Sequence, residues 1–155
     1  NLHAELLLRE TGRQGSTFGS SEKSVTALRA FLEGEVGIGK EDVTFTDGSG
    51  MSRLTLITPE ATTKLLAHMA ARDGWVGALP EGGVDGTLRR RFTGEAVRGK
   101  VRAKTGSLSH VSALGGYLEH PKLGRLAFTV VLNNYNTTTT EARAGIDKLV
   151  GTLLE

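Results

Sequence analysis

The residues best suited to chemistry in this chain form one short run, Lys104-Thr105-Gly106-Ser107, near the end of an expected strand. An edge strand offers backbone N–H and C=O groups to an extended peptide. Lys104 adds a cation, Thr105 and Ser107 add hydroxyls for a carboxylate, and Gly106 leaves room for the ligand backbone. The run therefore indicates a site for a peptide that carries a carboxylate. On the Lys-Thr-Gly tripeptide alone, an ordinary exposed strand end is the simpler interpretation.

Two segments earlier in the chain change that weighting. They are Asp47-Gly48-Ser49-Gly50-Met51-Ser52-Arg53 and Gly83-Val84-Asp85-Gly86-Thr87-Leu88-Arg89. In order and spacing, these segments and the Lys104 run resemble the class C, low-molecular-mass penicillin-binding proteins, a family of D-alanyl-D-alanine carboxypeptidases and endopeptidases. The opening Asn1-Leu2-His3-Ala4-Glu5 is similar to the residues that begin at the Asn of that family's S-x-N motif. The resemblance covers nearly the whole chain.

The resemblance implies a role for each residue of the expected site. Lys104 and Thr105 would hold the terminal carboxylate of the substrate, and the backbone N–H of Ser107 would supply half of an oxyanion hole. Asn1 would contact the acyl amide. Arg53 is a candidate for a second substrate carboxylate, with an ordinary surface or supporting role as the alternative. The full set of expected site residues is Asn1, Arg53, Lys104, Thr105, Gly106 and Ser107.

The nucleophilic serine of this family lies in an S-x-x-K motif that precedes S-x-N. One such string occurs here, Ser20-Ser21-Glu22-Lys23, but composition alone gives about 0.4 matches by chance. It also follows Asn1 instead of preceding it, and Ser20 can cap the helix expected next. Residues 1–155 are therefore interpreted as the C-terminal part of a penicillin-binding domain without its S-x-x-K region. Alone, they are expected to be inactive.

The resemblance implies serine acyl transfer on peptidoglycan peptides that end in D-Ala-D-Ala, with β-lactam antibiotics as further ligands and no cofactor. The expected partner is the remainder of the same enzyme, which carries the serine. A periplasmic or cell-envelope location follows from the resemblance only. Two alternatives stay open: a related serine β-lactamase or esterase, and a non-catalytic fragment. The choice between carboxypeptidase and endopeptidase is also open.

Composition excludes several other classes of protein. The 155 residues contain no Cys, which rules out disulfide scaffolds and thiolate sites, and the four His residues lack metal-ligand spacing. A net charge of +2 is too small for a nucleic-acid footprint, so the run Arg89-Arg90-Arg91 is interpreted as a solvated helix face or a local anion contact. No run is long and apolar enough for a membrane span. A single globular domain without a clear internal boundary is expected.

The elements that must position these residues follow from periodicity and turn signals. Helices are expected over 2–11, 21–33 and from Thr58-Pro59 to Gly74, and a closing helix over 141–154. Three strands, about 100–106, 111–119 and 125–133, should form an antiparallel meander. The predicted fold class is α+β, an antiparallel sheet with helices packed on it, as part of a serine β-lactamase/transpeptidase-like fold. The strand over 125–133 should be buried between helices, one of them the closing helix.

Two acidic residues are expected to have structural roles. Asp47 should fix the Gly-rich turn that follows it by accepting Asx-type hydrogen bonds, without a part in proton transfer. Asp85 should cap a short helical turn that runs through Phe92.

Overall fold

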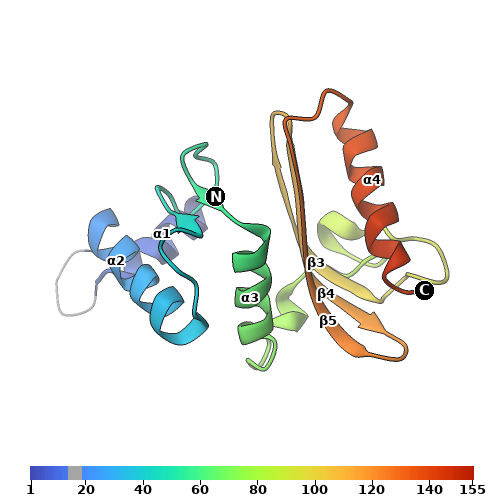
Figure 1. The fold of residues 1–155 in the computed structure, drawn as a ribbon, viewed down its shortest axis with the longest axis horizontal. Coiled ribbons are helices and arrows are strands. Elements are labelled where there is room, and N and C mark those ends of the chain that lie inside the picture. The colour runs from blue at the N-terminus through green and yellow to red at the C-terminus, as the bar shows by residue number, and fades with distance from the viewer. Residues whose placement is uncertain (14–18) are drawn as a thin grey trace. The chain divides into compact units, whose positions relative to one another are not determined.

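The computed structural model describes residues 1–13 and 19–155, which form two compact units, Asn1–Leu65 and Leu66–Glu155 (Figure 1). Each unit has a hydrophobic core of its own. The sequence gives no clear sign of a boundary near Leu65, because this residue lies inside a helix with uninterrupted apolar periodicity. None of the helices in the described ranges is long and apolar enough to span a membrane.

The first unit begins with two helices at the predicted places, α1 (Leu2–Thr11) and α2 (Ser21–Phe31). Ser20 caps α2, since its Oγ accepts a hydrogen bond from the Lys23 backbone N at 3.2 Å. The helix predicted to reach Glu33 instead changes at Leu32 into a π-helical turn, η1 (Leu32–Val36). The hydrogen bond from the Lys23 N to Ser20 Oγ confirms the structural role expected for Ser20.

A two-stranded antiparallel sheet completes the core of the first unit. Its strands are β1 (Val43–Thr44) and β2 (Leu56–Ile57). Helix α3 (Pro59–Met69) follows, and Thr58 Oγ1 accepts a hydrogen bond from the Ala61 backbone N at 3.1 Å, as the predicted Thr-Pro start requires. The helix ends before the predicted stop at Gly74. The buried core residues of this unit are Leu32, Ile38, Val43 and Ala61.

The second unit contains the predicted meander. Strands β3 (Val101–Leu108), β4 (Val111–His120) and β5 (Gly124–Asn133) pair antiparallel in the order β3-β4-β5. Short 3-10 helices, η2 (Val76–Ala78) and η3 (Gly86–Leu88), precede the sheet, and α4 (Thr139–Thr152) follows it. The α+β class is confirmed.

Helix α4 lies along one face of this sheet (Figure 1). Its Ile146 and Val150 are buried in a core that includes Val101, Ala103 and Leu114 from the strands. The predicted cover of one sheet face by the closing helix is therefore confirmed. The Cβ alternation of β3 puts Val101 and Ala103 on the face toward α4.

Strand β5 is less buried than its apolar run predicts. Phe128 is the buried residue of this strand, at 6% exposed, while Val130 and Val131 are partly exposed. The predicted burial holds in part, because Leu126, Phe128, Val130 and Leu132 contact the core while β4, not β5, is the central strand of the sheet. An apolar run indicates a strand, but the position of that strand in the sheet depends on which other strands it pairs with.

The close pairing of β3 and β4 depends on Gly116. A Cβ added there would lie 2.1 Å from the Arg102 carbonyl oxygen and 2.5 Å from the Ala103 Cα. Gly116→Ala should therefore destabilise the protein by about 1–3 kcal/mol. Gly145→Ala on α4, where a Cβ meets nothing within 4 Å, is the matched control and should be neutral or slightly stabilising. Urea unfolding measures both, and equal midpoints for the two variants would contradict the packing argument.

Candidate functional site

Strand β3 is an edge strand whose outer edge is only partly occupied. The segment before it pairs with its first half: the Gly82 N donates to the Val101 O at 2.8 Å, and the Ala103 N donates to the Pro80 O at 3.1 Å. Within residues 1–13 and 19–155, no strand or bridge continues this pairing beyond Ala103. The predicted run Lys104–Ser107 therefore lies where the outer edge becomes open.

The pairing also fixes which backbone groups point outward at this edge. Successive residues of a strand direct their N–H and C=O groups to opposite edges. Since Val101 and Ala103 use theirs toward the outer edge, Thr105 and Ser107 direct theirs the same way. The exposed Lys104 side chain bends to this edge too, because its Nζ donates to the Thr105 O at 2.7 Å. One open edge thus combines an ammonium group with an outward backbone N–H.

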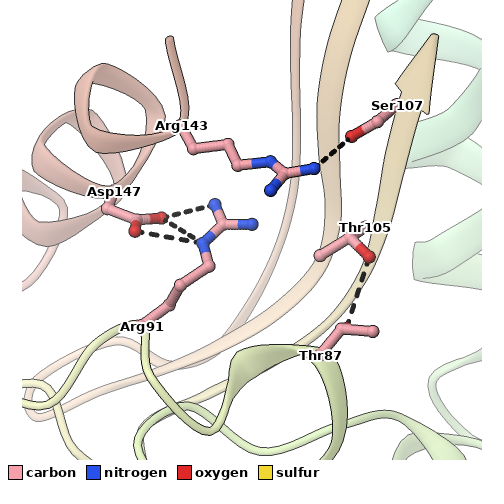
Figure 2. Close-up of polar contacts among 6 residues, drawn as sticks. All are labelled: Thr87, Arg91, Thr105, Ser107, Arg143 and Asp147. Atoms are coloured by element: carbon pink, nitrogen blue, oxygen red, sulfur yellow. Dashed lines mark hydrogen bonds and ion pairs between the residues drawn. The ribbon is translucent and has the colours of Figure 1, made fainter. Parts of the chain in front are cut away.

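The side chains of Thr105 and Ser107 continue the row that begins with Val101 and Ala103, on the face toward α4. Thr105 Oγ1 donates to Thr87 Oγ1 at 3.3 Å (Figure 2). Thr87 belongs to the Gly83–Arg89 segment, for which the sequence predicts no individual role. The hydroxyl groups expected for a carboxylate therefore do lie on the strand end, next to a third hydroxyl.

Ser107 has a partner that the sequence analysis does not predict. Arg143, one turn into α4, donates from Nη2 to Ser107 Oγ at 2.9 Å (Figure 2). Arg143 and Asp147 are four residues apart and so share one helix face beside the apolar stripe. This polar pair beside the apolar stripe of the closing helix is the signal in the sequence from which a polar contact of Arg143 could have been predicted.

Asp147, on the same helix face, joins α4 to the segment before β3. Arg91 Nε donates to Asp147 Oδ2 at 3.0 Å and Arg91 Nη2 donates to Asp147 Oδ1 at 2.5 Å, the forked geometry that makes Arg–carboxylate pairs strong (Figure 2). The side chains are only 14% and 23% exposed. Of the two interpretations of Arg89–Arg91, the anion contact therefore holds for Arg91.

Asp85 does not cap η3 as predicted, because its Oδ1 accepts from the Glu81 N at 2.8 Å.

The Gly-rich turn of the first unit is organised as predicted. Asp47 Oδ2 accepts hydrogen bonds from the Met51 N at 2.7 Å and the Ser52 N at 3.0 Å, and Oδ1 accepts from Thr55 Oγ1 at 2.5 Å. Desolvation acts to raise the pKa of Asp47, but these hydrogen bonds outweigh it, so the pKa is lowered. The carboxylate therefore stays ionised as a structural acceptor.

Glu5 supports the same turn from helix α1. Its Oε1 accepts from the Gly48 N at 3.2 Å and the Ser49 N at 3.0 Å. Hydrogen bonds from Ser49 and Gly48 lower the pKa of Glu5. No role for Glu5 is predicted from the sequence, since only the fold brings this residue to a turn more than 40 residues away.

Asn1 and Arg53 belong to the first unit, whereas the Lys104–Ser107 run belongs to the second. Asn1 is exposed at the start of α1, and Arg53 follows the turn that Asp47 fixes. The predicted convergence of both residues on strand β3 stays a prediction. Across the described part of the chain, no three acidic or His side chains are arranged to hold a metal ion.

Comparison with known proteins agrees with the resemblance seen in the motifs. A sequence model of the D-Ala-D-Ala carboxypeptidase 3 (S13) family matches residues 1–154. The chain therefore belongs to this family. The chain is also similar to a D-alanyl-D-alanine carboxypeptidase of an Actinomadura species, with 35% identity over 144 residues, or 88% of this chain and 26% of that protein.

Solved structures show the same relationship. The crystal structure of penicillin binding protein 4 from Haemophilus influenzae matches with a TM-score of 0.85 and 27% identity, over 98% of this chain and 36% of that one. The same protein complexed with a novel β-lactam matches with a TM-score of 0.81 and 28% identity, over 97% of this chain and 36% of that one. The predicted penicillin-binding fold is confirmed. The chain spans about a quarter to a third of the length of the curated relatives it matches.

The helix that carries Arg143 begins with a capping box. The Glu141 N donates to Thr138 Oγ1 at 3.2 Å, and Glu141 Oε2 accepts from the Thr138 N at 3.0 Å and from Thr137 Oγ1. The hydrogen bonds from Thr137 and Thr138 lower the pKa of Glu141 from 4.5 to about 2. The ionised carboxylate therefore stabilises the start of α4.

This cap predicts a specific acid sensitivity. Because the pKa of Glu141 is lower in the folded state, its stabilisation is complete above pH 4.5 and is lost as the pH falls toward about 2. Glu141→Gln should be less stable than the wild type at neutral pH, and the difference should shrink through that window. Unfolding curves at several pH values measure it. Glu95→Gln, at an exposed position outside the helix caps, is the control. A difference that stays constant with pH would contradict the assignment.

Proposed function

We propose that residues 1–155 are the C-terminal part of the penicillin-binding domain of a serine-type D-alanyl-D-alanine carboxypeptidase or endopeptidase. Membership of the D-Ala-D-Ala carboxypeptidase 3 family supports this reaction class. The observation that carries the proposal is the open edge of β3, where the Lys104 ammonium and the outward Ser107 N–H occur together. The edge accepts an extended peptide by strand addition.

In this proposal the nucleophilic serine and its S-x-x-K motif lie in the remainder of the same protein. The serine oxygen attacks the carbonyl carbon of the D-Ala-D-Ala peptide bond, D-Ala leaves as the amine, and water or another amine then accepts the acyl group. The Ser107 N–H stabilises the oxyanion formed at each addition. One such donor contributes about 3–4 kcal/mol to the transition state.

The other residues of the proposed site bind and orient the substrate. Lys104 and Thr105 hold the terminal carboxylate, and Gly106 lets the peptide approach the strand closely. A Cβ at position 106 would meet only the Ala113 Cβ, at 3.4 Å, so the sheet face opposite α4 is clear at this residue. Asn1 contacts the acyl amide, and Arg53 binds a second carboxylate of the peptide.

The proposed substrates are peptidoglycan peptides ending in D-Ala-D-Ala, and the proposed inhibitors are β-lactam antibiotics. A β-lactam complex of the Haemophilus influenzae relative supports the second assignment. The work of the enzyme then takes place in the periplasm or cell envelope, where peptidoglycan is found. Relatives that are called carboxypeptidases favour this function over a β-lactamase or esterase of the same fold.

Labelled penicillin tests the proposed function directly. The complete protein should be acylated stoichiometrically at a serine outside residues 1–155, while this chain alone should not be labelled. Ser20 is the residue to check within the chain, because its Oγ already caps α2 and accepts from the Lys23 N. Peptide mapping by mass spectrometry identifies the labelled residue. Stoichiometric label on Ser20, or no label on the complete protein, would overturn the proposal.

Within the complete enzyme, Lys104 should be the residue of this chain whose loss reduces activity most. Lys104→Ala removes the cation that pairs with the substrate carboxylate, and it should slow both penicillin acylation and D-Ala-D-Ala cleavage by about tenfold or more. Lys104→Arg should be milder because the charge is kept. Lys122→Ala, an exposed lysine in the β4–β5 turn, is the matched control. An acylation rate for Lys104→Ala within about threefold of wild type would remove this strand from the active site.

A further inference from the structure

We propose that Arg143 is a positioning residue that turns the Ser107 hydroxyl into a donor for the substrate's terminal carboxylate, and so selects substrates with a free carboxylate. The inference rests on the proposed function. The observation behind it is the hydrogen bond from Arg143 Nη2 to Ser107 Oγ at 2.9 Å (Figure 2).

The direction of this hydrogen bond is fixed by chemistry. A guanidinium group has donors only, so Ser107 Oγ must be the acceptor. The single hydrogen of the hydroxyl is then left to donate to another group. At the open end of β3, next to the Lys104 ammonium, a carboxylate is the acceptor that gains most from such a donor.

Thr105 is in a different state. Its hydroxyl donates to Thr87 Oγ1 at 3.3 Å, so its hydrogen is already directed toward a neighbour within the protein. Before substrate arrives, Ser107 is therefore the hydroxyl of this run that is oriented to donate outward. Arg143 supplies that orientation together with a positive charge.

The position of Arg143 is held by the rest of helix α4. One turn further along, Asp147 forms the forked pair with Arg91. On the same helix Ile146 and Val150 are 1% and 0% exposed in the core under the sheet. A helix anchored by both contacts keeps the backbone of Arg143 at a constant place relative to β3, and the hydrogen bond to Ser107 Oγ places the guanidinium. A positioning role requires this constancy.

The selectivity arises because a charged acceptor benefits more than a neutral one. A charge-assisted hydrogen bond is about twice as strong as a neutral one, so a carboxylate loses more than an ester when the oriented donor is lost. Arg143 therefore acts on substrates that end in a carboxylate and has little effect on those in which it is esterified. A purely structural role for Arg143 would affect both kinds equally.

The test compares acylation of the complete enzyme by benzylpenicillin and by its carboxylate methyl ester. Arg143→Ala should lower the acylation rate about tenfold for benzylpenicillin and less than about twofold for the ester. Arg143→Lys, which keeps a charged donor, should recover part of the loss. Lys148→Ala removes an exposed charge from the same helix and is the control. Arg143→Gln gives the same comparison if the Ala variant does not fold.

A double-mutant cycle with Ser107→Ala tests whether Arg143 acts through the hydroxyl. In the Ser107→Ala background, Arg143→Ala should have almost no further effect on benzylpenicillin. Additive effects, equal losses for both compounds or no loss at all would overturn the inference while the wild type is still acylated. A wild type that is not acylated would overturn the proposed function and this inference together.

Discussion

The outer edge of β3 is paired along its first half only, and the rest of the proposed site depends on this constraint. Among the described residues, the backbone hydrogen bonds from the segment before the strand reach Ala103 and stop there, so the edge changes from occupied to open within one strand. An edge that was paired throughout would have no free backbone groups for a peptide, and a fully open edge would invite pairing with other chains. The open part coincides with the run Lys104–Ser107, which combines a lysine, a glycine and two hydroxyl residues.

The proposed site also requires that the open end of β3 keeps its shape. In the part of the chain that the structure describes, the strand beyond Ala103 pairs on the β4 side only, and its residues that face α4 are polar instead of apolar. Arg143 and the Arg91–Asp147 pair link the strand end and the preceding segment to α4, in place of the hydrophobic contacts that hold the first half. The strand passes from core to site without a break, since Val101 and Ala103 are buried in the row that Thr105 and Ser107 continue.

The sequence predicts the local features of this fold well. The three strands, the capped starts at Ser20 and Thr58 and the turn around Asp47 depend on residues close together in the chain, and all are found. The features that depend on distant contacts are missed. The burial of β5 requires the strand order, and the Arg143–Ser107 contact joins residues 36 apart. The Lys104–Ser107 run is predicted from its motif, because hydrophobic periodicity locates a strand but does not show which of its residues form a site.

The most direct test of the central claim is a crystal structure of the complete enzyme acylated by a β-lactam. The acyl carbonyl oxygen should lie about 3 Å from the Ser107 backbone N, at hydrogen-bond distance. The carboxylate of the bound drug should accept a hydrogen bond from Ser107 Oγ. An acyl group bound away from the outer edge of β3, with the Ser107 N–H directed to another protein segment, would contradict the claim that this edge forms the wall of the active site.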